Sequence, residues 1–144
     1  MGKDKIRRFA AVKQFDNFIE PVIKEQCILK GKWKSEFFKN DNPIVLELGC
    51  GKGEYSVGLA KHYPNKNFIG VDIKGARMFI GAEQARDEEM KNVGFLRTKI
   101  DFIEDCFVEN EVDEIWLTFS DPQPKKENKR LTSPIFINRY RGIL

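Results

Sequence analysis

Residues 44–55, "IVLELGCGKGEY", join a short apolar run to three glycines that alternate with other residues. The run at 44–48 is bounded by Pro43 and by the glycines, which predicts a buried strand of a parallel sheet. Tyr55 and Leu59 then fall at helical spacing, so the stretch is expected to form a strand, a loop and a helix. The glycines of the loop are Gly49, Gly51 and Gly53.

The same rhythm continues along the chain. Apolar runs predict further strands, and amphipathic segments between them predict helices. The strands are expected at 68–71, 94–97 and 114–119, and the helices at 74–91 and 100–107. This alternation indicates an α/β fold, namely a Rossmann-like, doubly wound, mostly parallel sheet with right-handed crossovers.

The first 42 residues lack this alternation. Residues 1–42 are expected to form a basic N-terminal arm and a helical segment, ahead of a ligand-binding domain at 43–144. A helix is predicted over 15–29, interrupted at Pro21 because proline breaks a helix interior. The aromatic residues expected to pack in this segment are Trp33, Phe37 and Phe38.

Length and composition place the chain among globular proteins of one domain. It has 144 residues, 41% of them hydrophobic and 33% charged, which is enough for a core and unlike a disordered chain. No run reaches the roughly 18 apolar residues of a membrane span, and no apolar segment follows the N-terminus as in a secretory signal. Cys27, Cys50 and Cys106 form no CxxC motif, which favours reduced thiols in the cytoplasm and argues against a zinc site.

Charge is distributed unevenly. Residues 1–13 and 125–141 together hold eleven of the 25 basic side chains but only two of the 22 acidic ones. The middle of the chain is therefore acidic although the net charge is +3. Basic ends are suited to binding a polyanion. The simpler interpretation is that they only aid solubility.

The glycine loop limits the choice of ligand. A dinucleotide motif, GxGxxG, would need glycine where Glu54 stands, and no GK[ST] follows as in a phosphate-binding P-loop. Asp72 ends the next strand 19 residues after Gly53, where a carboxylate is suited to the two hydroxyls of a ribose. Together with Glu47 it makes the site anionic, which favours S-adenosylmethionine, a positively charged donor, over NAD. Alternatively, the glycines only shape a tight turn and Asp72 caps the next helix.

The segment after the last expected strand carries the most specific motif. It reads "LTFSDPQPKKENKR" at 117–130 and places Asp121 at the carboxyl end of a strand, ahead of four cations. This motif resembles that of the tRNA (guanine-N7)-methyltransferases, and the resemblance extends over 43–144. Further stretches that match the family in order and spacing are "ELGCGKG" at 47–53, "FIGVDIK" at 68–74 and "EVDEIWLTFSDP" at 111–122.

The resemblance implies transfer of a methyl group from S-adenosylmethionine to N7 of a guanosine in tRNA, which for the family lies in the variable loop. It also implies that Asp121 is catalytic or binds the donor. The implied donor-binding residues are Glu47, Gly49, Gly51, Gly53, Asp72 and Ile100. The implied tRNA contacts, whose charges are expected to pair with phosphates, are Lys125, Lys126, Lys129 and Arg130.

The chain departs from the family pattern at three places. Gln123 stands where the family has tryptophan, and Lys99 and Ile100 stand where it has an acidic residue and alanine near the adenine. Family members also continue beyond Leu144, so the C-terminal strands are expected to be missing. The sheet edge at 114–119 is then expected to be uncovered, which favours association of chains through that edge.

Two other classes of function stay open on the sequence. One is a methyltransferase that acts on a small molecule or a protein, whose tRNA binding would be weak and insensitive to salt. The other is a tRNA-binding module that lacks turnover. The salt dependence of tRNA binding separates the first from the tRNA enzyme, and methyl transfer separates the second.

Overall fold

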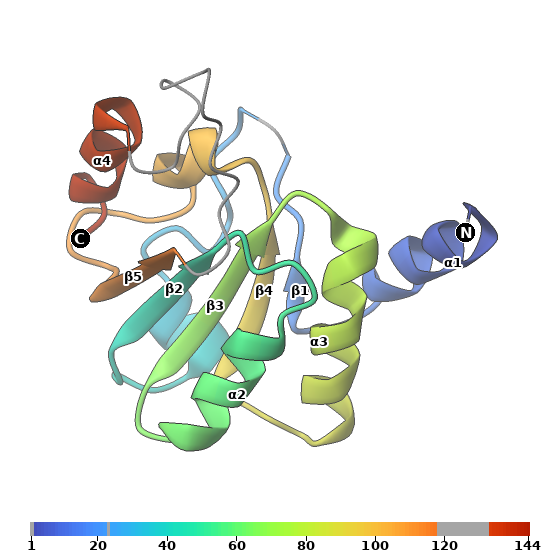
Figure 1. Cartoon of the computed structure of the whole chain (residues 1–144). Coiled ribbons are helices and arrows are strands. Elements are labelled where there is room, and N and C mark those ends of the chain that lie inside the picture. Colours follow the sequence, from blue (N-terminus) through green and yellow to red (C-terminus); the bar gives the residue numbers. More distant parts are fainter. Residues whose placement is uncertain (1, 23, 118–132) are drawn as a thin grey trace.

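The computed structural model describes residues 2–22, 24–117 and 133–144. Within them, five strands form one sheet in the order β1-β4-β3-β2-β5, and all four strand pairs are parallel (Figure 1). The strands are β1 (Phe18–Ile19), β2 (Ile44–Leu48), β3 (Asn67–Asp72), β4 (Val93–Arg97) and β5 (Glu114–Leu117). The helices are α1 (Gly2–Val12), the π-helix η1 (Trp33–Phe38), α2 (Glu54–His62), α3 (Gly75–Asp87), the 3-10 helix η2 (Ile100–Asp105) and α4 (Pro134–Arg141).

The order of the strands creates a switch point beside β2. From β2 the chain adds β3 and then β4 on one side, and then returns to place β5 on the other side of β2. In open α/β sheets, ligands bind outside the carboxyl ends of the strands at such a point. The predicted α/β, Rossmann-like parallel sheet is therefore confirmed, and it places the glycine loop after β2 at the expected position.

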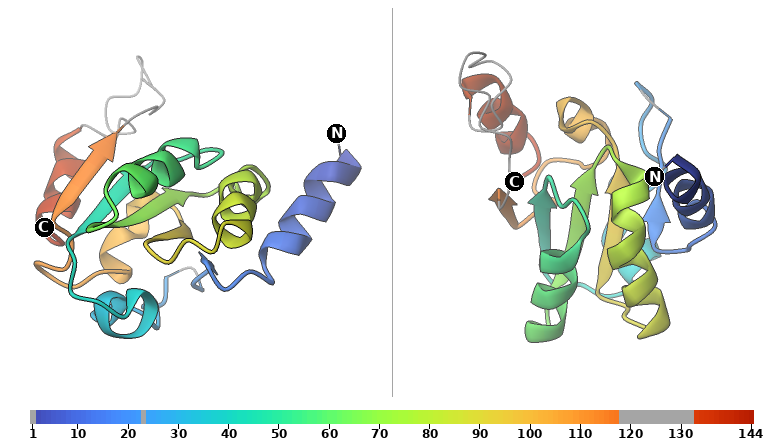
Figure 2. Two further views of the ribbon diagram at one scale, coloured as in Figure 1. Left: turned by 90° about the horizontal axis from the view of Figure 1, so that it is seen from below. Right: turned by 45° about the vertical axis from the view of Figure 1, so that its right-hand side comes forward.

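Helices cover both faces of the sheet. Figure 2 shows α2 and α3 together on one face, with η1 on the opposite face. Alternate residues of β2 point to different sides, as the pleat requires: Leu46 joins the core on the η1 side, whereas Val45 joins the core beneath α2 and α3. Glu47 shares the α2 side, where it meets Ser56.

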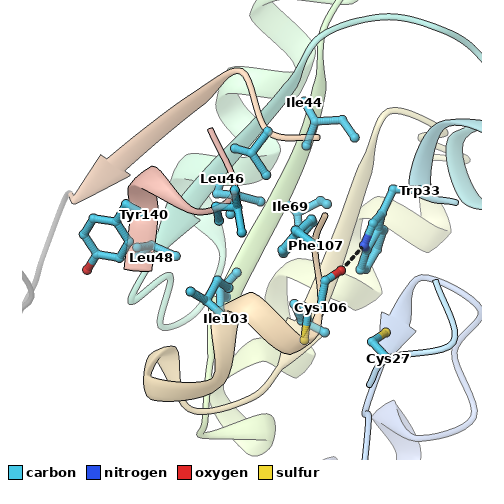
Figure 3. Packing of buried hydrophobic residues seen from close by; sticks show 14 of the residues in the cluster. Cys27, Trp33, Ile44, Leu46, Leu48, Ile69, Ile103, Cys106, Phe107 and Tyr140 are labelled. Carbon is cyan, nitrogen blue, oxygen red and sulfur yellow. Dashed lines mark hydrogen bonds between the residues drawn. The ribbon is translucent and has the colours of Figure 1, made fainter. Parts of the chain in front are cut away.

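The core on the η1 side joins distant parts of the sequence (Figure 3). Trp33 is fully buried and stacks on Phe107 with ring centroids 5.2 Å apart. Its indole Nε1 donates a hydrogen bond of 2.8 Å to the carbonyl oxygen of Cys106. The expected packing of the aromatic residues at 33–38 is thus confirmed, with Trp33 and Phe38 buried and Phe37 partly buried against them.

The predicted helix over 15–29 is wrong. Phe15 and Phe18 have helical spacing and are both buried, but the Phe18 amide closes a turn on the Phe15 carbonyl and the chain then enters β1. The helix of this region is instead α1, which packs on α3 at the edge of the sheet. Five of its eleven residues are charged and Val12 is its one buried residue, so the sequence alone indicates a basic arm.

Two predicted helices differ in extent from the prediction, whereas the predicted end of the last strand, at 118–119, lies outside the described residues. Helix α3 ends at Asp87 rather than near residue 91, because Glu89 has a positive φ of 54° that a helix cannot continue. The helix expected at 100–107 is the shorter η2. Strand β5 is described to Leu117, and within the described residues β2 is its only strand partner, so it forms one edge of the sheet.

Candidate functional site

The glycine loop between β2 and α2 is tied to the end of β3 by three backbone amides. Gly49 and Cys50 donate to the carbonyl oxygen of Val71, at 2.8 and 3.0 Å. Gly51 donates to Oδ2 of Asp72 at 2.8 Å. The loop and the carboxylate that ends β3 are therefore built as one unit before any ligand binds.

The three loop glycines all have positive φ, and two of them differ in what surrounds them. At Gly53, a Cβ atom would lie 2.5 Å from Cε1 of Phe95, so the residue must be bare for α2 to approach the sheet. At Gly49, a Cβ atom would meet nothing within 4 Å, so this part of the loop faces open space. The open side of the loop is where a ligand can contact the backbone closely.

Two carboxylates flank the loop. Asp72 Oδ1 accepts a hydrogen bond of 2.7 Å from the Ile73 amide, while Oδ2 accepts from Gly51. Glu47 is only 3% exposed, and its Oε1 accepts a hydrogen bond of 2.7 Å from the Ser56 hydroxyl. The helix that follows the glycines thus orients one carboxylate, and the glycine loop orients the other. Both predicted acidic residues of the donor site are brought to the same loop.

The electrostatics of the loop are anionic. Burial raises the pKa of the Cys50 thiol well above its ordinary value, and the nearby carboxylates of Asp72 and Glu47 raise that pKa further. The thiol therefore stays neutral and serves as a small buried filler, not as a nucleophile. An anionic loop with an open backbone suits a ligand that carries positive charge, such as a sulfonium.

The end of β4 lies beside this loop. The Thr98 amide donates to the carbonyl oxygen of Asp72 at 3.0 Å, which joins the ends of β3 and β4. Ile100 begins η2, and its partly buried side chain packs against the core on the η1 side. The backbone at Lys99 and Ile100 thus comes to the carboxyl edge of the sheet, and the donor contact of Ile100 stays a prediction.

The predicted catalytic and tRNA-contacting residues lie outside the described residues. They all belong to 118–132, and they are Asp121, Lys125, Lys126, Lys129 and Arg130, together with the divergent Gln123. Leu117, the last described residue before them, pairs in register with Leu48, directly ahead of the glycine loop. The sheet therefore connects the glycine loop to the start of this segment.

The prediction from sequence missed one feature beside the loop, a cavity of about 670 Å³ between α1 and the start of α3. We call it the α1–α3 groove. Its basic lining residues are Lys5, Arg8, Lys52, Lys74, Arg77 and Arg97. The basic run at 1–13 was the available signal, but it did not indicate which element the N-terminal arm would meet.

Comparison with known proteins places the chain among methyltransferases. The model of a family described as "Putative methyltransferase" matches residues 41–144. A curated tRNA (guanine-N(7)-)-methyltransferase of Bacteroides fragilis (strain YCH46) is 57% identical, and the match covers 100% of this chain and 59% of that protein. One of Christiangramia forsetii (strain DSM 17595) is 54% identical, covering 99% and 66%. The chain thus spans about three fifths to two thirds of the length of these relatives.

Solved structures share the fold at low sequence identity. A 16S rRNA (adenine(1408)-N(1))-methyltransferase from Catenulisporales acidiphilia, with cosubstrate SAM, has a TM-score of 0.61 at 18% identity, covering 78% of this chain and 51% of that one. A SAM dependent methyltransferase from Aquifex aeolicus has a TM-score of 0.55 at 21% identity, covering 78% and 56%. At such identities the likeness shows the architecture of the sheet and helices alone.

Proposed function

The chain belongs to the family described as "Putative methyltransferase", and from this membership we propose that it transfers a methyl group from S-adenosylmethionine to N7 of a guanosine in tRNA. The observation that carries the proposal is the 57% identity, over the whole chain, to a curated tRNA (guanine-N(7)-)-methyltransferase. The preformed glycine loop with its two carboxylates supports it, because that loop offers the chemistry that a sulfonium nucleoside needs. We take the target guanosine to lie in the variable loop.

The donor would be held by the unit formed by the glycine loop and Asp72. Bound there, S-adenosylmethionine supplies an activated methyl group on a cationic sulfur. Asp72 is suited to the ribose hydroxyls, and Glu47 contributes negative charge beneath the loop. The open backbone at Gly49 allows close approach, and the backbone at Lys99 and Ile100 would border the adenine.

Guanine N7 needs no general base, because its lone pair is available in the plane of the ring. The task of the protein is then to place N7 in line with the methyl group, which is catalysis by positioning. Extracting a base from folded RNA costs a few kcal/mol, which contacts at the edge of the sheet must offset. We assign the orientation of the guanine or of the donor to Asp121. Lys125, Lys126, Lys129 and Arg130 are assigned to the tRNA backbone.

Three further assignments belong to this proposal. The enzyme acts in the cytoplasm, where tRNA is available. Residues 1–42 form a basic arm, and residues 43–144 form part of the methyltransferase domain. Chains associate through the free edge of β5, a proposal that a clean monomer in sedimentation velocity would overturn. For membranes, the described residues contain no helix that is long and apolar enough to span a bilayer.

The proposal is tested by transfer of labelled methyl from S-adenosylmethionine to unmodified bulk tRNA, followed by nuclease digestion to identify the product. We expect 7-methylguanosine from the unchanged chain and none from Asp121→Ala. Asp16→Ala, which removes an exposed carboxylate away from the glycine loop, is the matched control and should retain transfer. A different methylated product, or activity that survives in Asp121→Ala, would contradict the proposal. Absence of transfer together with tight tRNA binding would favour a binding module.

A further inference from the structure

The α1–α3 groove has a strong excess of positive charge. Six basic side chains line it, and Asp4 is the only acidic residue among its lining. That carboxylate is already near Arg7, with 3.7 Å between Oδ1 and the guanidinium Nε. Arg97 is likewise neutralised, by an ion pair of 2.9 Å with Glu20. The remaining charge of the groove therefore comes from the other five cations.

These five cations are poorly compensated by the protein. Within the described parts of the chain, Lys5, Arg8, Lys52, Lys74 and Arg77 form no ion pair, and the guanidinium of Arg8 lies 5.9 Å from the centroid of the Phe79 ring. Nε of Arg8 is buried, and among the described residues it has no hydrogen-bond partner. A buried donor without a partner carries a desolvation cost that an incoming acceptor would remove. An anionic ligand would supply both the missing acceptor and the missing negative charge.

Apolar side chains also line the groove, and one of them is aromatic. Phe9 of α1 lies there, with the guanidinium of Arg97 4.7 Å from its ring centroid. Ile73, Ala76 and Ile80 complete the apolar lining. A lining that combines cations with apolar side chains suits a strand whose phosphates pair with the cations while its sugars and bases contact the apolar side chains. A small inorganic anion would leave this apolar surface unused.

The groove is continuous with the donor site. Lys52, one of its lining residues, belongs to the glycine loop, and Ile73 directly follows Asp72. The Arg77 guanidinium lies over the loop, since a Cβ atom built at Gly51 would be 3.6 Å from its Nη2. A polymer in the groove would therefore pass the edge at which the methyl donor is proposed to bind.

We propose that the α1–α3 groove binds the sugar-phosphate backbone of the substrate tRNA on the side of the glycine loop away from β5. This inference rests on the proposed function and adds a second RNA contact, separate from the cations at 125–130. It gives the basic N-terminal run a role that solubility alone would not require. The groove contributes affinity and orientation, because phosphate contacts carry no sequence information.

The experiment compares two double variants that remove the same charge. Lys5→Ala with Arg8→Ala removes two groove cations, whereas Lys3→Ala with Lys91→Ala removes two exposed cations that do not line the groove and leaves Asp4 beside Arg7. Binding of unmodified tRNA is measured by fluorescence anisotropy over a range of salt. We expect the groove variant to bind tRNA about tenfold more weakly. We also expect the slope of the logarithm of the binding constant against the logarithm of the salt concentration to fall by about two units. The control should change affinity less than about threefold, since no direct phosphate contact is lost.

Circular dichroism of both variants checks that α1 is retained, and calorimetry checks that S-adenosylmethionine binds as before. If the two variants lose the same tRNA affinity, the proposal that the groove binds tRNA is overturned. The proposed function stands in that case as long as 7-methylguanosine is still formed. If only the groove variant loses tRNA affinity and the unchanged chain forms no 7-methylguanosine, the tRNA-binding role of the groove is supported and the proposed methyl transfer is overturned. Absence of tRNA binding by the unchanged chain would overturn both.

Discussion

The glycine loop and the α1–α3 groove adjoin one another, yet they differ in charge and in how they are built. The loop is anionic, with Glu47 and Asp72 beside an open backbone. It is formed by neighbouring elements, β2, α2 and the end of β3. The groove is cationic and forms only where the N-terminal helix meets α3. Carboxylates and cations thus lie next to one another along a single edge of the sheet.

The strongest test of the loop is Gly53→Ala. The new Cβ atom would overlap the Phe95 ring at a residue whose φ is 78°. Overpacking and left-handed strain together should lower the free energy of unfolding by about 3 kcal/mol or more. Urea denaturation measures the change. Gly58→Ala is the control, because nothing lies within 4 Å of its Cβ position in α2, and it should stabilise by about 0.5–1 kcal/mol.

Asp72→Asn tests whether the charge of the loop selects the donor. The substitution keeps the shape of the side chain but removes the negative charge that accepts from Gly51. Charge-assisted hydrogen bonds contribute about 1.5–3 kcal/mol, so affinity for S-adenosylmethionine should fall about tenfold to a hundredfold. Titration calorimetry measures this fall, and Asp16→Asn should show none. Unchanged affinity would mean that the carboxylate serves only to shape the loop.

Ser56→Ala separates the buried carboxylate from the loop itself. It removes the hydroxyl that donates 2.7 Å to Glu47 Oε1 in a site closed to water. We expect a loss of about 1–2 kcal/mol in the free energy of unfolding. Thermal and urea unfolding measure this loss. The control is Ser35→Ala, whose exposed hydroxyl should contribute less than about 0.5 kcal/mol to the free energy of unfolding. Equal effects of the two variants would show that Glu47 does not depend on Ser56.

The smallest expected effect concerns Cys50 and depends on pH. Cys50→Ala should cost about 1 kcal/mol near neutral pH by removing a buried side chain, while methyl transfer persists. Above the ordinary thiol pKa of 9.0, the unfolded chain releases the Cys50 proton and the folded chain keeps it. The unfolded state then binds fewer protons, so this residue lowers stability as pH rises. Urea unfolding should show that the difference in free energy of unfolding between the unchanged chain and Cys50→Ala is smaller at pH 10 than at pH 7. A larger difference at pH 10 would contradict the raised pKa.

The sequence predicted the loop well and the groove poorly, for a physical reason. Strand β2 and the glycines show their structure locally, through an apolar run followed by residues that tolerate positive φ. Asp72 could also be predicted from a local pattern, because it is the last residue of the next strand along the chain. By contrast, α1 packs on an element some seventy residues away, and no local pattern encodes that meeting. The roles of Asp121 and the cations at 125–130 remain predictions.

The pairing of the two-residue strand β1 also determines the order in which parts of the chain can fold during synthesis. Phe18 and Ile19 pair with Phe95 and Leu96, so the N-terminal segment leaves the ribosome long before its partner strand exists. At roughly 5–20 residues per second, it waits several seconds for β4 and for α3. Contacts of such high sequence separation also slow folding. A nascent chain would therefore complete its acidic loop first, and its basic groove only once β4 had joined the sheet.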